Sequence, residues 1–503
     1  MGKYILAFDL GTTAIKVALI DAEGAMCASA TMEYRLLTPD VLSVELPAET
    51  YWENFKAGVK KVLTESGVSP EDIVCMGISA QGETILLLDK DGRELGNAIV
   101  WMDNRAQDEA QELDEKFPQF YEHTGQVSVV PTWPAAKVLW IRRHEPERFA
   151  AIDKVLLIED YFIWRMTGKF TCEASLICST GYWDIRTEKW WPEMLEAIGI
   201  TERQLPEIRR SGEPVGELLT DIAEELGLSP KTVVCMGVLD QAAGAIGAGN
   251  IRPGCFSECT GAALGICATV DEIFMDEMKQ MPCHYHGMPK TYMAHTFTSG
   301  GMVLKWYKDN FCQQEIDVAE CMGASPFQLI DKEAAQVPPG SDGLIMLPHL
   351  QGAMAPEANP KAKGVFYGIT MKHTRAHFAR AIMEAVAYIV KRNLKTLERM
   401  GFEFDEIRVL GGGSVSPLWN QIKADITGKV ICQTSTPDAG CLGAAVVAGS
   451  GCGLYKDIED AVDHMVKITA RYIPDEKNHA MYEEQFEKYV SLYEALCPVF
   501  EMD

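Results

Sequence analysis

The sequence lacks the patterns that mark several classes of protein. Its 15 cysteines include no Cys-x-x-Cys pair, which argues against a zinc ribbon or a disulfide framework and favours reduced thiols. No uncharged apolar run approaches the roughly 18 residues of a membrane span, and Asp9 interrupts the first apolar run before it reaches signal-peptide length. No GxxxxGK[ST] motif occurs, so a P-loop fold is not expected. We therefore expect a cytoplasmic protein with no membrane partner.

Basic residues are scarce relative to acidic ones. The chain has 46 Lys and Arg against 72 Asp and Glu, a formal net charge of −26. Because this charge repels a phosphate backbone, no nucleic-acid partner is expected, and an anionic ligand must bind at a local site. The 503 residues, of which 47% are hydrophobic, suggest two or three globular domains.

Short apolar runs separated by turns open the chain. The runs over residues 4–9, 14–20 and 26–31 predict adjacent hairpin strands. Apolar residues at helical spacing predict a helix over residues 49–66, and a strand over residues 73–79 follows. This order predicts the start of a mixed α/β sheet.

The opening pattern is repeated near residue 260. Residues 255–270 form two strand-like runs joined by a Thr-Gly turn, much as residues 4–20 do. This internal similarity predicts two related domains, residues 1–249 and 250–503, instead of a tandem array. A strand over residues 233–239 precedes the boundary and leads into an Ala- and Gly-rich segment, whose small side chains would let a helix approach its neighbours closely.

Three turns that contain Gly with Thr or Ser follow predicted strands, at residues 9–13, 259–261 and 411–414. Their backbone N–H groups and hydroxyls could form anion-binding concavities. A single turn of this kind is better explained by ordinary turn geometry, which needs glycine whether or not a ligand binds. Three of them at the edges of two α/β halves favour phosphate binding.

Two acids, Asp9 and Asp240, end apolar runs beside small residues. This placement suits the carboxyl edge of a sheet, where open α/β proteins bind ligands. A carboxylate there could hold Mg²⁺, usually through water, or accept a proton from a hydroxyl nucleophile. For Asp240 the alternative is a helix N-cap.

The segments 81–84 and 101–105 together contain polar side chains and an indole ring. Hydrogen-bonding groups beside an aromatic face suit a polyhydroxylated substrate. The alternative is a buried Trp beside an Arg–Asp surface pair. His284 and His286 have the wrong spacing for two ligands on one helical face, so we expect a loop or core role.

These segments resemble the FGGY carbohydrate kinases, a family that includes xylulokinases, gluconokinases, ribulokinases and glycerol kinases. The resemblance covers nearly the whole chain, and its strongest element is GVFYGITMKHTRAHFARAIME at residues 364–384. The other matching segments are DLGTT at 9–13, WMDNRA at 101–106, DYFIWRMTG at 160–168, LDQAAGAIGAG at 239–249, TGAALG at 260–265 and GGGSVSPLWNQIKADITG at 411–428.

The resemblance implies an α/β fold of two actin-like ATPase (ribonuclease H-like) domains with a catalytic cleft between them. The N-terminal domain would bind the sugar and carry the catalytic base, and the C-terminal domain would bind ATP. ATP and Mg²⁺ are the implied cofactors, and a small-molecule sugar or polyol is the implied partner. We leave a homodimer open.

The family's site residues can be carried over position by position. Asp240 would be the catalytic base, and Asp9 and Asp240 would lie at the metal. The substrate-binding positions would be Gln81, Glu83, Trp101, Asp103 and Gln241, and the ATP- and phosphate-binding positions would be Thr12, Thr13, Thr260, Gly261, Gly300, Gly412 and Asn420.

The departures from the family patterns concern the substrate. Xylulokinases usually carry Met-His where this chain has Gly82-Glu83, and glycerol kinases place an Arg at the position of Gly82. Gly82 is therefore expected to leave space for a substrate longer than three carbons. Asp240-Gln241 is closer to glycerol kinases, whereas residues 131–147 are closer to xylulokinases.

The resulting prediction is ATP-dependent phosphorylation of a primary hydroxyl of a ketopentose or related sugar, with conversion of D-xylulose to xylulose 5-phosphate as the leading candidate. The alternatives are a kinase for glycerol, erythritol, gluconate or another polyol. A different class, an actin-like nucleotide switch without a sugar substrate, uses the same fold.

Overall fold

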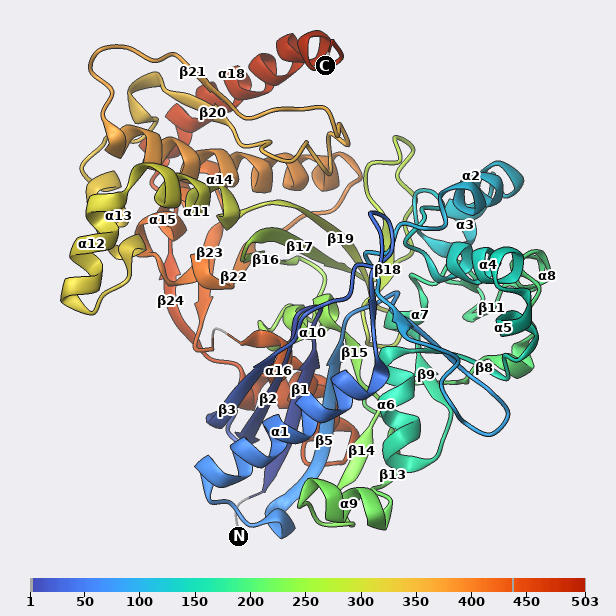
Figure 1. Cartoon of the computed structure of the whole chain (residues 1–503). Helices are drawn as coiled ribbons and strands as arrows, with labels where there is room; N and C mark the ends of the chain where they lie inside the picture. Colours follow the sequence, from blue (N-terminus) through green and yellow to red (C-terminus); the bar gives the residue numbers. More distant parts are fainter. Residues whose placement is uncertain (1–2, 437, 503) are drawn as a thin grey trace.

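Two seven-stranded sheets organise the chain in the computed structural model, which describes residues 3–436 and 438–502 (Figure 1). In the first sheet the central strand β1 is antiparallel to β2 and parallel to β5. Its path runs β13-β14-β5-β1-β2-β3, and β15 also pairs with β5. The bounds are β1 (Tyr4–Leu10), β2 (Ala14–Asp21), β3 (Met26–Glu33), β5 (Ile73–Ala80), β13 (Pro214–Glu217), β14 (Val233–Cys235) and β15 (Val238–Leu239).

The second sheet repeats this arrangement. Its central strand β16 is antiparallel to β17 and parallel to β22, as β1 is to β2 and β5. The path runs β18-β19-β17-β16-β22-β23-β24. The internal similarity seen in the sequence is thus a repeated sheet, and the predicted two-domain α/β fold is confirmed. The bounds are β16 (Cys255–Thr260), β17 (Ala263–Val270), β18 (Cys283–Tyr285), β19 (Tyr292–Ser299), β22 (Glu406–Leu410), β23 (Val430–Thr434) and β24 (Ile468–Tyr472).

Two helices cover opposite faces of the first sheet. Helix α1 (Ala48–Ser66) packs on β2 and β3, where Val17 meets Gly58. Helix α16 (Ala439–Gly451) comes from the second half of the chain, yet it packs on β1 and β5 behind the sheet in Figure 1. The predicted helix over residues 49–66 and strand over residues 73–79 are confirmed to within one residue.

Helix α16 also crosses α10 (Asp240–Gly247) with backbone in direct contact. A Cβ placed on Gly247 would lie 2.0 Å from the carbonyl oxygen of Ala439, and one on Gly443 would lie 1.9 Å from that of Ala243. Such separations are far inside van der Waals contact, so only glycine fits either position. The predicted close approach of the small-residue helix is confirmed.

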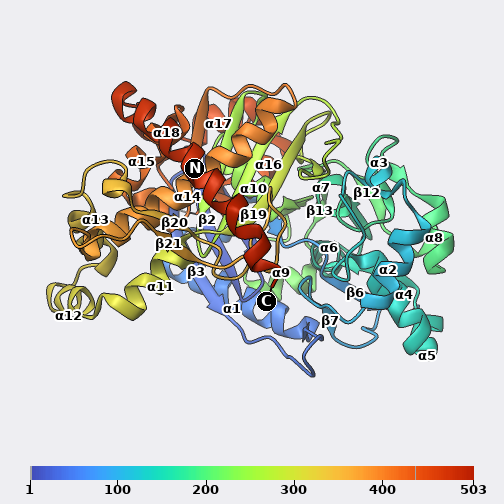
Figure 2. The same ribbon diagram turned by 90° about the horizontal axis from the view of Figure 1, so that it is seen from above.

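The remaining elements form outlying lobes. Figures 1 and 2 place the helices α2–α5 and α8 at one end of the molecule and α12 and α13 at the other. The lobe beside the first sheet contains α2 (Gln107–Lys116), α3 (Phe120–Thr124), α4 (Pro134–His144), α5 (Pro146–Ala150), α6 (Ile158–Thr167), α7 (Ala174–Ile177), α8 (Pro192–Ile198) and α9 (Thr220–Leu226), with the short strands β4 (Glu45–Leu46), β6 (Ile85–Leu88), β7 (Ala98–Ile99), β8 (Lys154–Leu157), β9 (Thr171–Glu173), β10 (Trp183–Asp184), β11 (Lys189–Trp190) and β12 (Glu207–Arg209).

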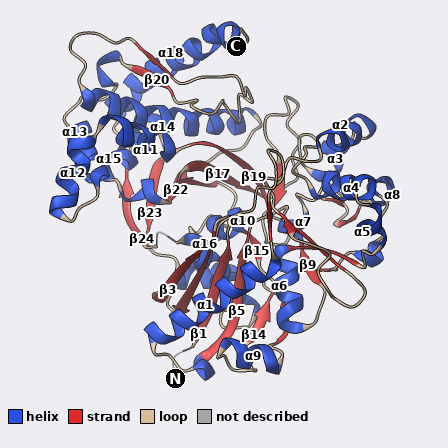
Figure 3. Cartoon of the chain, viewed as in Figure 1, coloured by secondary structure: helices blue, strands red, loops and turns tan. Residues whose placement is uncertain are grey.

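The second half is richer in helix around its sheet (Figure 3). Its elements are α11 (Gly301–Phe311), α12 (Gln313–Met322), α13 (Pro326–Ala334), α14 (Arg375–Arg399), α15 (Pro417–Thr427), α17 (Ile458–Met465), α18 (Glu476–Phe500), β20 (Ile345–Leu347) and β21 (Val365–Tyr367). His284 on β18 and His286 just after it are buried, which confirms a core role. Of the helices described, none has both the length and the apolar character needed to cross a bilayer.

Candidate active site

The two predicted acids lie where the sheet meets the crossing helices. Asp9 is the penultimate residue of β1, and Asp240 is the first residue of α10. The N-cap of that helix is Leu239, so helix capping does not account for Asp240. Both positions suit ligand binding at the carboxyl edge of the central strands.

Three carboxylates influence one another at this edge. Burial, followed by the negative charges of Asp9 and Glu83, raises the pKa of Asp240 to about 8. Burial also raises the pKa of Asp9, although Ser79 opposes this by donating a 2.6 Å hydrogen bond to Asp9 Oδ1. The sequence-based reasoning missed Ser79. A site with three half-buried acids of raised pKa favours a bound cation, because a positive charge would restore their ionised forms.

Glu83 is held in a sparsely populated backbone conformation by a buried lysine that the sequence did not reveal. Its φ is 56°, in the left-handed region, which in a non-glycine residue is often associated with functional sites. Lys137, on α4, is fully buried, and its Nζ donates to the carbonyl oxygens of Glu83 at 3.0 Å, Val100 at 3.0 Å and Trp101 at 3.3 Å. Burial lowers the pKa of Lys137 to about 7. A buried lysine looks like any surface lysine in a sequence, so only the fold could identify it.

Trp101 and Gln81 flank the same region. The half-buried Trp101 donates from Nε1 to Thr12 Oγ1 at 2.8 Å. Gln81 donates from Nε2 to the Tyr51 hydroxyl at 3.2 Å, while its buried Oε1 has no hydrogen-bond partner within the described protein. An orphaned buried acceptor is costly unless a ligand satisfies it.

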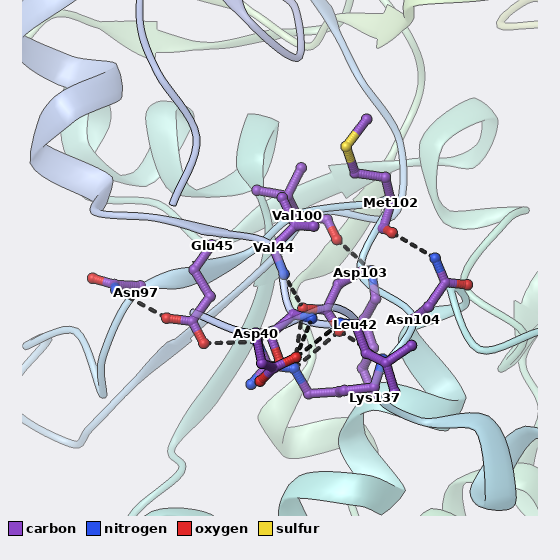
Figure 4. Close-up of polar contacts among 12 residues, drawn as sticks. Asp40, Leu42, Val44, Glu45, Asn97, Val100, Met102, Asp103, Asn104 and Lys137 are labelled. Carbon is purple, nitrogen blue, oxygen red and sulfur yellow. Dashed lines mark hydrogen bonds and ion pairs between the residues drawn. The ribbon is translucent and has the colours of Figure 1, made fainter. Parts of the chain in front are cut away.

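Asp103 is engaged with the protein. Its Oδ1 accepts from Arg105 Nε at 2.9 Å, and its Oδ2 accepts from Arg105 Nη2 at 2.8 Å and from the Val44 N–H at 2.6 Å (Figure 4). Arg105 also pairs with Glu45 at 2.7 Å. A carboxylate in a bidentate pair has little capacity left for a sugar hydroxyl. The geometry favours a positioning role for Asp103 in the loop that carries Trp101.

The space expected at Gly82 is filled, which corrects the sequence-based argument. A Cβ at this position would lie 3.1 Å from Leu239 Cδ1 and 3.2 Å from Ser179 Oγ. The absence of an arginine side chain therefore does not leave an open volume, because these two neighbours close over the glycine.

Gln241 extends the site toward the second half. A Cβ on Gly265, in β17, would lie 3.1 Å from Gln241 Oε1. Hydrogen bonds with the backbone and side chain of Gln241 also lower the pKa of Asp240, against the larger effect of burial. Gln241 thus lies between the predicted base and the second sheet.

The predicted nucleotide residues of the second half are brought together. The Gly301 N–H donates to the Gly261 carbonyl at 2.8 Å, and Gly300 is the N-cap of α11. A Cβ on Gly413 would lie 2.6 Å from Thr260 Cγ2, so the turn containing Gly412 packs on the same hairpin. Asn420, in α15, donates from Nδ2 to the Ser414 carbonyl at 2.7 Å. The turn at Gly261, the start of α11, the turn at Gly412 and the start of α15 therefore lie close together.

Thr12 and Thr13 occupy the corresponding hairpin of the first half, where Thr13 is exposed and Thr12 is half-buried. Because Thr12 Oγ1 accepts from Trp101, its own hydroxyl proton remains available to an anionic oxygen. Thr260 differs, since its Oγ1 donates to Glu258 at 2.6 Å and accepts from Lys423 at 3.1 Å. Its hydroxyl is saturated, so a phosphate contact at Thr260 would have to use the backbone N–H.

A buried network supports the segment that leads into Asp240. The Leu239 N–H donates to Ser175 Oγ at 2.9 Å, and Ser175 Oγ donates to Glu173 at 2.6 Å. Glu173 also accepts from the Ser175 and Leu176 N–H groups. The sequence-based reasoning missed this network, for which no local motif gave a signal.

The residues fit a magnesium nucleotide. Asp9 and Asp240 offer the hard oxygen ligands that Mg²⁺ takes. A Cβ on Gly440 would lie 3.6 Å from Asp9 Oδ2, so this glycine keeps bulk away from the acid. The buried Oδ1 of Asn420 has no hydrogen-bond partner within the described residues, leaving an acceptor for a ligand.

Several known proteins are similar to this chain in sequence and fold over nearly its whole length. Xylulose kinase from Escherichia coli (strain K12) is 30% identical and covers 98% of this chain and 99% of its own. Gluconokinase from Bacillus subtilis (strain 168) is 29% identical, with 98% of this chain and 96% of its own covered. The ligand-bound crystal structure of xylulose kinase from Lactobacillus acidophilus superposes with a TM-score of 0.90 at 26% identity, covering 99% of both chains.

Family comparison divides the match between the two halves. Residues 4–247 match the N-terminal domain of the FGGY family of carbohydrate kinases, and residues 272–452 match its C-terminal domain. The first sheet lies within the N-terminal match, whereas β16 and β17 of the second sheet lie between the two matched ranges and β24 follows the second one. The chain therefore belongs to the FGGY family and is a carbohydrate kinase.

Proposed function

We propose that this kinase transfers the γ-phosphoryl group of ATP to a primary hydroxyl of a ketopentose, with D-xylulose as substrate and xylulose 5-phosphate as product. The observation that carries the proposal is the acidic, largely shielded site formed by Asp240, Glu83, Gln81 and Trp101, in which a buried acceptor of Gln81 has no hydrogen-bond partner within the described residues. Glycerol, erythritol, gluconate and other polyols are the alternative acceptors. The absence of a nucleic-acid partner stays a prediction, and a homodimer stays possible.

Asp240 would accept the hydroxyl proton as the sugar oxygen attacks phosphorus. A carboxylate whose pKa is raised toward neutrality is a stronger base than an ordinary aspartate, and it still ionises near physiological pH. Leu239 is fixed through Ser175, so the base follows a rigid segment. The N–H groups of Gly261 and Gly300 donate to the carbonyl oxygens of Ala263 and Ala262. The N–H groups of the turn at Gly412, with the Thr12 hydroxyl, would therefore stabilise charge on the phosphoryl oxygens.

Magnesium, when bound, would supply positive charge that neutralises the phosphoryl oxygens, and Asp9 and Asp240 would hold it, usually through water. We place the nucleotide phosphates at the turns of the second half and the adenosine near Asn420. The buried Oδ1 of Asn420 and the buried Oε1 of Gln81 have no hydrogen-bond partner within the described residues. The first supports a nucleotide site in the second half of the chain, and the second supports a sugar site in the first half.

The charges of the site favour a neutral acceptor over an aldonate. Asp9, Glu83 and Asp240 are all acids, and Lys137, the cation beside Glu83, already donates to three carbonyls. A substrate carboxylate would find Lys137 occupied, and its charge would be repelled by the ionised forms of the three acids. Glu83 instead offers acceptors to a pair of sugar hydroxyls.

An ADP-release assay with D-xylulose, D-gluconate and glycerol tests the proposal, using wild-type enzyme and Glu83→Gln. We expect D-xylulose to give the highest kcat/KM, and Glu83→Gln to lower it by about tenfold or more, about 1.4 kcal/mol, with KM for ATP unchanged. If gluconate is the true substrate, removing the negative charge should instead raise its kcat/KM. Asp91→Asn, an exposed acid far along the β6–β7 turn, serves as the charge-matched control.

A further inference from the structure

Three cysteine thiols from three separate elements converge between the first sheet and helix α16. Cys75 lies on β5, Cys235 ends β14, and Cys452 is the C-cap of α16. Their Sγ atoms all lie within 4.8 Å of one another, and those of Cys235 and Cys452 are 3.3 Å apart. Cys75 and Cys235 are fully buried, whereas Cys452 is partly exposed. The scattered positions of these residues in the sequence gave no sign of the cluster.

We infer that this thiol cluster, Cys75, Cys235 and Cys452, is a binding site for a thiophilic metal ion, and that Zn²⁺ is the ion it fits. Tetrahedral zinc with Zn–S bonds of about 2.3 Å places its sulfur ligands about 3.8 Å apart. The Cys235–Cys452 separation of 3.3 Å is shorter than that value, and no separation in the cluster exceeds 4.8 Å, so small side-chain rotations would suffice. Zinc accepts three protein ligands with water in the fourth position, and the exposed side of Cys452 gives water access.

Charge favours Zn²⁺ over Cu⁺, the other soft ion that thiolates select. Three thiolates leave a net charge of −1 around Zn²⁺ but −2 around Cu⁺, and burial penalises the larger uncompensated charge. Zinc binds thiolates, so any of the three that is a protonated thiol before binding would release its proton to solvent as its Zn–S bond forms.

The thiol cluster is separate from the phosphoryl-transfer site. Helix α16 has 13 residues, which corresponds to a length of about 20 Å. Gly440, near its start, faces Asp9, and Cys452 caps its end. A zinc ion would join the end of this helix to β5 and β14, and would stabilise the packing of the second half of the chain on the first sheet.

The test uses the reduced, full-length protein, freed of metal by chelation. Zn²⁺ is titrated against a chromophoric chelator, and Co²⁺ replaces it as a spectroscopic probe. We expect one tightly held ion per chain, a thiolate-to-cobalt charge-transfer band with tetrahedral d–d bands, and a higher Tm with zinc. Cys452→Ser should weaken zinc binding at least 100-fold and remove the charge-transfer band.

Cys441→Ser is the matched control, since it removes a buried thiol from the same helix outside the cluster, and zinc affinity should not change. Cys235→Ser, tested separately, should reproduce the loss seen with Cys452→Ser. Unchanged affinity in Cys452→Ser would overturn the proposal, as would a cobalt spectrum without the charge-transfer band. Preferential retention of Cu⁺ at equal availability, or a Cys235–Cys452 disulfide in protein isolated without reductant, would overturn it as well.

Discussion

Trp101 donates its indole N–H to the hydroxyl of Thr12 across 2.8 Å. One residue was predicted to contact the sugar and the other the transferring phosphate, so the two functions share a hydrogen bond. The backbone of Trp101 is also held in place. Its backbone N–H donates to Thr84 Oγ1 at 3.0 Å, and its carbonyl oxygen accepts from Lys137 Nζ. The position of the acceptor and that of the phosphate hairpin are therefore linked before any ligand arrives.

Replacing Trp101 by Phe should separate these two functions. The ring face that packs on a sugar is largely retained, but Thr12 loses its donor and becomes free to rotate. We expect kcat to fall by about tenfold or more, with a smaller rise in KM for the sugar, because the lost interaction orients the phosphoryl-transfer step. Steady-state kinetics at saturating ATP measure both. A rise in KM alone would show that the hydrogen bond serves only the sugar.

Asp240→Asn should abolish most turnover and also stabilise the protein. Without a proton acceptor, kcat should fall by roughly 10²–10⁴. The raised pKa means that the folded protein binds this proton more tightly than the unfolded chain, so ionisation destabilises the fold progressively as pH rises from about 4 to about 8. Thermal unfolding should therefore show a higher Tm for the variant at pH 8, and a smaller difference at pH 5. Equal Tm values at pH 8 would contradict the burial of this charge.

The pH dependence of the wild-type enzyme should report the same group. Asp240, the proposed base, would act only when ionised, so kcat/KM for the sugar should rise with pH and level off above an apparent pKa near 8. In kcat, which reports the ternary complex, the same rise should occur at lower pH because a nearby bound cation favours the carboxylate. The residual activity of Asp240→Asn should not show this rise with pH. If the rise persists in that variant, it belongs to another residue.

Two glycines in the predicted nucleotide site should respond differently to alanine. A Cβ on Gly412 meets no atom within 4 Å, whereas one on Gly300 would lie 2.6 Å from backbone atoms of Ala263 and Leu264. Gly412→Ala should leave Tm unchanged and raise KM for ATP several-fold, because the methyl group occupies the ligand's space. Gly300→Ala should lower Tm as well, since the hairpin must move. If Gly412→Ala leaves KM for ATP unchanged, the nucleotide does not approach this turn.

Ser175→Ala should slow catalysis without direct contact with the substrate. It removes the acceptor for the Leu239 N–H and leaves Glu173 short of one donor. We expect destabilisation of about 1–3 kcal/mol and a several-fold fall in kcat with little change in either KM. Ser175→Thr, which restores a hydroxyl, should recover part of the kcat, while Ser66→Ala at the end of α1 provides a matched control. An unchanged kcat in Ser175→Ala would limit the network to folding.

Patterns that depend on local spacing could be predicted from the sequence. The hairpin of β1 and β2, the helix α1 and the second hairpin of β16 and β17 follow from apolar runs, helical periodicity and glycine-containing turns. Lys137 and Ser175 could not be found this way, because their importance comes from burial beside segments distant in the chain. The filled space at Gly82 shows the same limit, since Leu239, which closes it, is remote in sequence.

Helix α16 makes the two halves interdependent for folding. Its backbone lies so close to the first sheet that a Cβ on Gly77 would stand 2.2 Å from the carbonyl oxygen of Ala444. A fragment ending at residue 249 would lack this helix and present β1 and β5 to water as bare apolar strands. During synthesis nearly 200 further residues must therefore be added before helix α16 can pack on the first sheet. The early-made half would be a substrate for chaperones, and mixing separately produced halves would be a form of complementation between incomplete folds.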